Sequence, residues 1–378
     1  MKPKQSEPEI RAVVCAVRDA YEICVLTNHE SLVSVRVGDE TYYYADNGVR
    51  HSRCPLHKFR VPAEKLNAAG AYTVETEWMI KRLPYRSLRR PPVSRTFRFT
   101  PVPDEGPLRI YHVSDSHGLK AASVNAAGFF GETPDLLILN GDIASHTHTP
   151  KAAILPIEIA WGVTKGERPC VITRGNHDLR GKCAENLSLY YPTDRGRFYY
   201  PVYFPGLEIL VLECGEDKVD ECAEYGGTIC CHAYRKEETA FLREYCDQKQ
   251  KEPDNGDIRV VLSHIPFMHT DYDPVRGVHE FDIEQELYGE WVRLMNDVYR
   301  PRFGLFGHIH QVALIEGTGK FNEKGFTRPL ILGGKPDHAH KSVVGTSLVI
   351  DREKEEMTVR FTDSAHNVLE EHAVSLHL

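Results

Sequence analysis

Five short blocks of polar residues, each following an apolar run, carry the side chains of this 378-residue chain that are best suited to chemistry. The blocks are Ser114-Asp115-Ser116-His117, Asn140-Gly141-Asp142, Arg174-Gly175-Asn176-His177-Asp178, Ser263-His264-Ile265-Pro266 and Gly307-His308-Ile309-His310. Taken singly, an Asp or His after a strand is explained by a turn or by the start of a helix. Taken together, the blocks supply carboxylate, amide and imidazole groups, which bind divalent ions such as manganese, iron or zinc. None contains cysteine, which argues against a soft-metal or iron–sulfur site.

Each block follows a segment that we predict to be a buried strand. These strands span residues 108–113, 136–139, 169–173, 258–262 and 303–306. Between them, helical patterns occur at 151–163, 236–250 and 281–298, and later strands are expected at 328–332, 345–350, 357–361 and 368–374. Open α/β sheets bind ligands at the carboxyl ends of their strands. The sequence therefore predicts an α/β domain whose polar blocks gather at one sheet edge.

The first hundred residues have a different pattern. Short segments rich in β-branched and aromatic residues occur at 10–17, 20–27, 32–37, 41–45, 72–78 and 94–99. Several short strands without long helices between them predict an all-β sandwich of the immunoglobulin or fibronectin kind. Residues 101–107 contain three prolines and are predicted to be a linker. We thus expect a β-sandwich domain at 1–100 and an α/β domain at 108–378.

The order of the blocks, D-x-H, G-D, G-N-H-D, H and G-H-x-H, resembles that of the calcineurin-like metallophosphoesterase superfamily over roughly residues 108–350. The resemblance implies a four-layer α-β-β-α fold with two metal ions at the sheet edge. It implies that a hydroxide activated by these ions cleaves a phosphomonoester or a phosphodiester. Asp142 is expected to bridge the ions, which are manganese, iron or zinc. The other implied ligands are Asp115, His117 and His310 for the first ion, and Asn176, His264 and His308 for the second.

His177 has a separate role, because the superfamily does not use this histidine as a ligand. The resemblance implies that it acts as a general acid toward the leaving oxygen, or as a donor to a phosphoryl oxygen. Asp178 is expected to accept a hydrogen bond from the His177 ring and to orient it. The alternative is that Asp178 caps the following helix. Gly141, Gly175 and Gly307 precede ligands at sharp turns, where close backbone approach is easiest without a Cβ.

The sequence of this chain differs from the motifs of two branches of the superfamily, and these differences narrow the choice of branch. Protein serine/threonine phosphatases carry G-D-x-V-D-R-G, whereas this chain has Gly141-Asp142-Ile143-Ala144-Ser145-His146, which excludes that branch. Purple acid phosphatases have D-x-G in the first block and a tyrosine soon after the second. Here His117 replaces the glycine, and Ala144 or Ser145 stands where the tyrosine is needed. An iron–tyrosinate centre is therefore not expected, although a β-sandwich before the catalytic domain resembles the purple acid phosphatase layout.

Other polar residues near the blocks have two explanations each. Arg174 is expected either to contact a substrate phosphate or to form a surface salt bridge. The histidines His146, His148, His338 and His340 either line the pocket or are solvated loop residues.

Composition bounds the remaining function classes. The net charge of -8 argues against a dedicated nucleic-acid binder, so a nuclease is an alternative of lower rank. A non-catalytic scaffold on the same fold is a further alternative, which the complete ligand set disfavours. No apolar run approaches the roughly 20 residues of a membrane span, and residues 1–8 are not followed by the apolar stretch of a signal peptide. We therefore expect a cytoplasmic protein whose ten cysteines are mostly free thiols.

Overall fold

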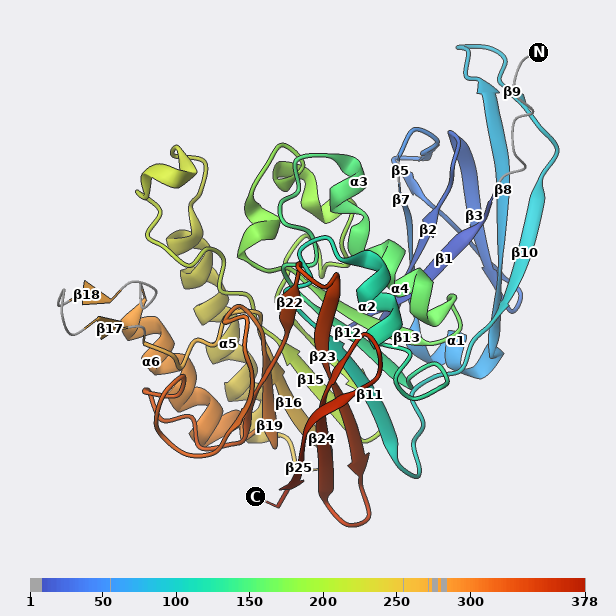
Figure 1. Cartoon of the computed structure of the whole chain (residues 1–378). Coiled ribbons are helices and arrows are strands. Elements are labelled where there is room, and N and C mark those ends of the chain that lie inside the picture. Colours follow the sequence, from blue (N-terminus) through green and yellow to red (C-terminus); the bar gives the residue numbers. More distant parts are fainter. Residues whose placement is uncertain are drawn as a thin grey trace.

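Two large sheets form the centre of the molecule (Figure 1). The computed structural model describes residues 9–377 except 55, 254, 271, 274–277 and 280–283. The ten-stranded sheet contains, in spatial order, β25 (Val368–Ser375), β24 (Glu356–Asp363), β23 (Ser342–Asp351), β11 (Leu108–Val113), β12 (Leu136–Asn140), β13 (Pro169–Thr173), β1 (Arg11–Val17), β2 (Ala20–Leu26) and β7 (Leu56–Pro62), with β22 (Lys335–Asp337) paired to β23. The six-stranded sheet contains β14 (Tyr200–Phe204), β15 (Leu207–Val211), β16 (Ile258–Leu262), β19 (Phe303–Phe306), β21 (Leu330–Gly333) and β20 (Val312–Ile315).

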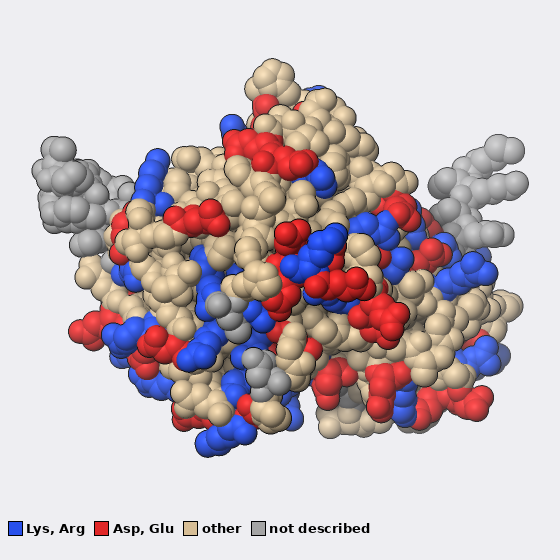
Figure 2. All heavy atoms as spheres, turned by 90° about the horizontal axis from the view of Figure 1, so that it is seen from below, with Lys and Arg blue, Asp and Glu red and all other residues tan. Residues whose placement is uncertain are grey.

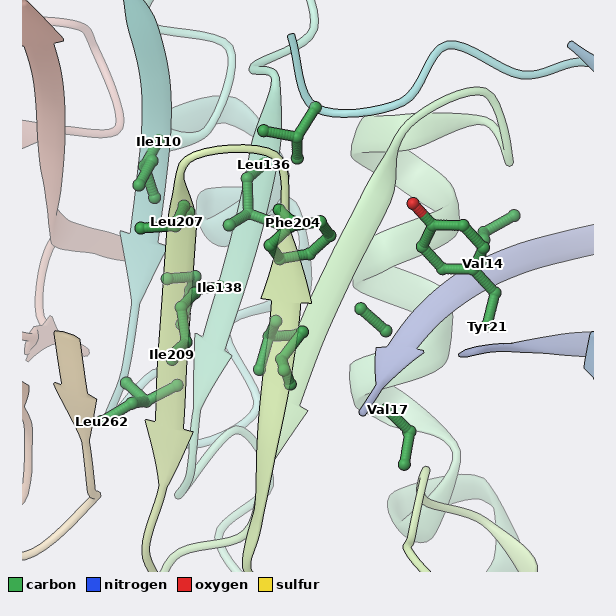
Figure 3. Packing of buried hydrophobic residues seen from close by; sticks show 14 of the residues in the cluster. Val14, Val17, Tyr21, Ile110, Leu136, Ile138, Phe204, Leu207, Ile209 and Leu262 are labelled. Atoms are coloured by element: carbon green, nitrogen blue, oxygen red, sulfur yellow. The ribbon is translucent and has the colours of Figure 1, made fainter. Parts of the chain in front are cut away.

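The two sheets pack face to face because their central strands are apolar on both sides. Successive side chains of a strand point to opposite faces. Ile110 and Ile138 therefore join the cluster between the sheets, where Ile209 of β15 also lies (Figure 3). Tyr111 and Leu137, one residue along, join a second cluster on the other face of the ten-stranded sheet. Burial on both faces is typical of parallel strands covered by helices.

Helices cover the outer face of each sheet. The apolar cluster outside the ten-stranded sheet includes residues of α2 (Lys120–Ala126) and α4 (Leu155–Thr164). The cluster outside the six-stranded sheet includes residues of α5 (Cys231–Lys251) and α6 (Gln285–Leu294). The layers are therefore helix, sheet, sheet and helix, and the predicted α-β-β-α fold is confirmed.

The N-terminal region forms the predicted β-sandwich, but one layer of it belongs to the large sheet. Its separate sheet contains β10 (Val93–Arg98), β8 (Ala71–Lys81), β3 (Ser31–Val37) and β4 (Glu40–Tyr43), with β9 (Leu88–Arg89) paired to β8. Val35 and Val74 of this sheet share a core with Val14 of β1. Strand β1 in turn pairs in parallel with β13, with Cys15 opposite Cys170. The division of the chain into domains at 101–107 stays a prediction.

Most predicted elements are present, and the structure contains further elements that the sequence did not predict. β11, β13, β16 and β19 have the predicted bounds, and the predicted helix at 151–163 is divided into α3 (Pro150–Ala153) and α4. The helix predicted at 281–298 is α6 followed by a π-helical turn at Met295–Tyr299, and 281–283 lie outside the described residues. Strands β7, β14 and β15 and helices α1 (Ala63–Ala69) and α2 were not predicted. In β14, Pro201 interrupts the strand pattern, and the edge position of β14 tolerates it.

Several short elements complete the described fold. They are β5 (Ala45–Asp46) paired with β6 (Val49–Arg50), β17 (Tyr272–Asp273) paired with β18 (Val278–His279), and 3-10 turns at Asn176–Leu179, Ala184–Leu189 and Ala223–Tyr225. In the described part of the chain, no helix has the length and apolarity needed to cross a bilayer. The ten cysteines form no disulfide. Basic and acidic side chains are interspersed over the face shown in Figure 2.

Candidate metal centre

The five polar blocks meet at one place, at the carboxyl ends of β11, β12, β13, β16 and β19. Three overlapping groups have ligand atoms within 4.8 Å of one another: Asp115, His117 and His310; His117, Asp142 and His177; and Asp142, His264 and His308. Residues with left-handed backbone conformations cluster here, with φ values of 53° at Asp115, 43° at His117, 52° at Asp142, 67° at His308 and 55° at His310. Such conformations are costly without glycine and gather at functional sites.

The first group brings three potential ligand atoms close together. His117 Nε2 lies 3.0 Å from His310 Nε2, and His310 Nε2 lies 3.5 Å from Asp115 Oδ1. Burial lowers the pKa of His117 to about 4, so its ring is neutral at pH 7 and offers a lone pair. Asp115 accepts hydrogen bonds from the Ser114 hydroxyl and from the His308 backbone N–H, which fix its carboxylate. This donor set fits a divalent cation.

The second group has a histidine whose tautomer is settled by its partner. His264 Nδ1 lies 2.7 Å from the Asn140 carbonyl oxygen, which only accepts, so Nδ1 carries a proton. His264 Nε2 is buried, makes no hydrogen bond, and lies 3.3 Å from Asp142 Oδ2. Burial alone lowers the pKa of His264, but the carboxylates of Asp142 and Asp115 outweigh it and raise that pKa to about 10. A buried nitrogen facing two carboxylates is a position that a metal ion can occupy in place of a proton.

Asn176 gives a further indication that a cation fits this group. Its amide oxygen lies 3.2 Å from His308 Nδ1 and 3.2 Å from Asp142 Oδ2, and its amide nitrogen faces Arg180. Burial lowers the pKa of His308 to about 4, so at pH 7 Nδ1 can act as an acceptor. Rotating the amide by half a turn lets it donate to both atoms in the metal-free protein. In either orientation the amide lies next to His308 Nδ1 and Asp142 Oδ2, so it is placed to take part in this group.

His177 lies beside both groups, but its ring is not held by Asp178. His177 Nδ1 lies 2.9 Å from the Ser145 carbonyl oxygen and therefore carries a proton. Its Nε2 lies 3.9 Å from Asp142 Oδ2, and the side chain is 31% exposed. The prediction that Asp178 accepts a hydrogen bond from this ring is wrong. The orienting group is a backbone carbonyl on the loop that follows Asp142.

Asp178 instead braces the loops that carry the ligands. Its carboxylate accepts hydrogen bonds from the backbone N–H of Gly175 at 2.8 Å and of Asp142 at 3.2 Å, and from the Tyr191 hydroxyl at 2.9 Å. The alternative, that Asp178 caps a following helix, is also wrong: Asp178 is the third residue of the 3-10 helix Asn176–Leu179, and its carboxylate accepts from the backbone N–H of the N-cap residue, Gly175. Because the chain turns into a 3-10 helix at Asn176, the Asp178 side chain points back to the loop and away from the His177 ring.

Residues 108–325 match the calcineurin-like phosphoesterase family. The chain belongs to this family. Its fold is similar to that of purple acid phosphatase PPD1 from yellow lupin (Lupinus luteus) seeds, with a TM-score of 0.59 at 12% identity over 97% of this chain and 74% of that one. It is also similar to PhoD, with a TM-score of 0.52 at 9% identity over 99% of this chain and 90% of that one. Family and clustered side chains together support metal-dependent phosphoester hydrolysis in general.

The metal centre of this phosphoesterase opens into a cleft of about 600 Å³. Besides Asp142 and His177, its walls include residues that the sequence did not single out for a role, namely Asp217, His269, Lys320 and Phe321. His269 Nδ1 lies 2.9 Å from Glu323 Oε2, and His308 Nε2 lies 3.9 Å from Asp217 Oδ2. These residues lie outside the five strand-end blocks, so the motif spacing in the sequence did not indicate that they line the cleft.

The other polar residues considered from the sequence lie apart from the ligands of the phosphoesterase. Arg174 is partly buried, donates to Glu213 Oε2 at 2.8 Å and lies over the Phe198 ring, so it forms a largely shielded ion pair with a buried carboxylate and not the surface salt bridge that was one of its two explanations. His340 is exposed and paired with Asp337. The His338 ring is 6.5 Å from that of His117, at the rim of the centre. The His146 and His148 rings are 6.3 Å apart, next to each other on the loop after Asp142.

Gly175 is a steric requirement of the centre, and its replacement by alanine is expected to displace Asp142. A Cβ at Gly175 would overlap Asp142 Oδ1 and lie 2.7 Å from both Asp142 N and His264 Cδ2. We expect Gly175→Ala to lower the free energy of unfolding by about 1–3 kcal/mol, the usual cost of overpacking, and to weaken metal binding. Thermal melts and metal analysis after dialysis measure both effects.

Gly289 provides the matched control, because a Cβ added there meets nothing within 4 Å. It lies inside helix α6, so Gly289→Ala is expected to stabilise the protein by about 0.5–1 kcal/mol. Metal content should not change in this variant. Equal metal content in Gly175→Ala and the native protein would contradict the steric argument.

Proposed function

We propose that this phosphoesterase holds two divalent metal ions and hydrolyses a phosphomonoester or a phosphodiester. Asp115, His117 and His310 would hold one ion, Asn176, His264 and His308 would hold the other, and Asp142 would be shared by both. When bound, two such ions lower the pKa of a water molecule and stabilise charge on the attacking and leaving oxygens. The observation that carries the proposal is the convergence of these side chains, whose potential ligand atoms lie 3.0–3.9 Å from one another.

His177 supplies the proton for the leaving oxygen in this proposal. Its Nδ1–H is held by the Ser145 carbonyl, so the ring orientation is fixed and Nε2 is the atom that exchanges a proton with the substrate. The ring lines the same cleft as Asp142, Asn176 and His308. A histidine is suited to this role because small changes in its surroundings move its proton on or off near neutral pH.

Hydrolysis of p-nitrophenyl phosphate and of bis-p-nitrophenyl phosphate tests the proposal. We expect metal-stripped protein to be inactive and added manganese to restore cleavage of at least one of the two esters. Faster cleavage of the bis-ester identifies a diesterase, and faster cleavage of the monoester identifies a phosphatase. Absence of manganese-, iron- or zinc-dependent cleavage of both esters would contradict the proposal and favour a non-catalytic scaffold.

A further inference from the structure

A hairpin of the N-terminal sandwich extends well beyond the rest of its sheet (Figure 1). We call residues 79–93 the arm. The pairing of β8 with β3 ends at Trp78 opposite Ser31. Beyond that point β8 pairs only with the short strand β9, at Met79–Arg89 and Lys81–Leu88. At its base the arm is also bonded to its neighbours, because the Met79 N–H donates to the Glu30 carbonyl oxygen and Arg82 donates to the Arg50 carbonyl oxygen, whereas Tyr85 at the tip is fully exposed.

The charge of the arm is opposite to that of the chain. The arm contains five Lys or Arg residues and no Asp or Glu, whereas the whole chain has a net charge of -8. Arg89 pairs with Glu77 at the base, and Arg82 donates to the Arg50 carbonyl oxygen. Lys81 and Arg86 form no ion pair with any described residue. The tip therefore presents positive charge to its surroundings.

Apolar side chains lie between these cations and are exposed as well. The exposed fractions are 60% for Ile80, 39% for Leu83, 102% for Tyr85, 40% for Leu88 and 42% for Val93. They are five of the eleven large hydrophobic residues that are exposed in the described part of the chain, within fifteen residues. Single exposed apolar residues need no explanation, but such a concentration marks an interaction surface.

We propose that the arm anchors this protein to the surface of an anionic phospholipid bilayer. Cations next to aliphatic and aromatic side chains match such a surface, where charged heads meet anionic headgroups and apolar parts enter the interface. A nucleic acid could pair its phosphates with the cations and stack a base on Tyr85, but it would leave Ile80, Leu83 and Leu88 exposed to water. The acidic remainder of the chain is repelled by an anionic surface. Contact is therefore confined to the arm.

In Figure 1 the arm tip at β9 and helix α3, in the loop that follows Asp142, both lie at the upper side of the view. When the arm contacts the bilayer, helix α3 and the segment after Asp142 therefore lie on the side of the molecule toward which the arm tip extends. Binding itself does not depend on metal or on catalysis, so its test is independent of the proposed function.

Co-sedimentation with vesicles tests the charge of the arm. We expect the protein to bind vesicles of phosphatidylcholine with about 30% phosphatidylglycerol, and not phosphatidylcholine alone, with binding weakened by about 0.5 M salt. Each basic residue near an anionic surface strengthens binding about fivefold, so Lys81→Glu with Arg86→Glu should weaken it by roughly 25-fold or more. Lys236→Glu with Lys251→Glu, on the exposed side of α5, is the matched control and should change binding little.

The same assay tests the apolar residues of the arm. Leu83→Ser with Tyr85→Ser should weaken vesicle binding by about tenfold or more, because these side chains no longer enter the interface. Val368→Ser with Leu369→Ser, at exposed positions of β25, is the matched control. All four variants should melt like the native protein and cleave soluble esters at its rate, because these residues are exposed and lie outside the metal centre.

Three results would overturn the proposal. The first is that the native protein does not bind the anionic vesicles. The second is that the arm variants bind these vesicles as tightly as their control variants. The third is salt-sensitive binding of single-stranded RNA or DNA that the arm substitutions abolish, without binding to vesicles, which would assign the arm to a nucleic acid.

Discussion

Replacing His177 by alanine is expected to lower turnover by about 10²–10⁴-fold, the scale of losing a general acid, while metal content stays near that of the native protein. The ring is held through Nδ1 by the Ser145 carbonyl, and it lies at the cleft with Nε2 3.9 Å from Asp142 Oδ2. Steady-state kinetics with p-nitrophenyl esters measures turnover, and elemental analysis of the same sample measures the metals.

The metal measurement decides between two roles for this histidine. His177 also belongs to one of the groups that lie close enough to hold an ion, together with His117 and Asp142. Loss of metal in His177→Ala would make it a ligand, and full activity would remove it from the mechanism. His340→Ala is the control, because that ring is exposed and paired with Asp337 outside the ligand groups. This variant should keep both turnover and metals.

The strand ends were predictable from the sequence because two local signals coincide there. An apolar run, as in β13 or β16, ends where a polar block begins, with Arg174-Gly175 after β13 and Ser263-His264 after β16. The bounds of these strands follow from residues within the strand itself. The pairing of β1 with β13 could not be predicted, because it joins segments about 150 residues apart and nothing in either strand specifies its neighbour.

The role of Asp178 was predicted wrongly, again because the sequence does not show which distant residues come into contact. Sequence proximity to His177 suggested a bond between the two side chains, but a 3-10 turn starting at Asn176 points them in different directions. The partner of His177 is Ser145, which is 32 residues away in the chain. The arm was passed over because the acidic balance of the whole chain conceals a local run of cations at 81–90.

The N-terminal sandwich is tied to the loop that carries the ligands. Lys58 of β7 pairs with Glu22 of β2 and donates to the carbonyl oxygens of Ser188 and Tyr191. The Tyr191 hydroxyl then donates to Asp178, which accepts from the ligand loops. Together with the pairing of β1 and β13, these bonds connect the first hundred residues to the metal centre through the sheet and through side chains.

Asp142 should have the largest effect on metal binding, because it is the residue placed between the two ligand groups. Its Oδ2 lies 3.3 Å from His264 Nε2 and 3.9 Å from His117 Nε2, and its Oδ1 accepts from the His177 backbone N–H. We expect Asp142→Asn to weaken binding of both ions by more than the roughly 10–100-fold that follows loss of a residue behind a ligand. Isothermal titration of metal-stripped protein with manganese measures this.

Thermal unfolding separates the loss of metal from a loss of fold. A metal present at about 100 times its dissociation constant stabilises the native protein by about 2.7 kcal/mol, and Asp142→Asn should lose most of this increment. Asp135→Asn is the matched control, since Asp135 is a buried carboxylate at the other end of β12, paired with Arg109. The Asp135→Asn variant should melt at a lower temperature than the native protein both with and without metal, and it should still be stabilised when metal is added. If Asp142→Asn also retains it, the bridging role is excluded, because one shared carboxylate cannot be lost without weakening both ions.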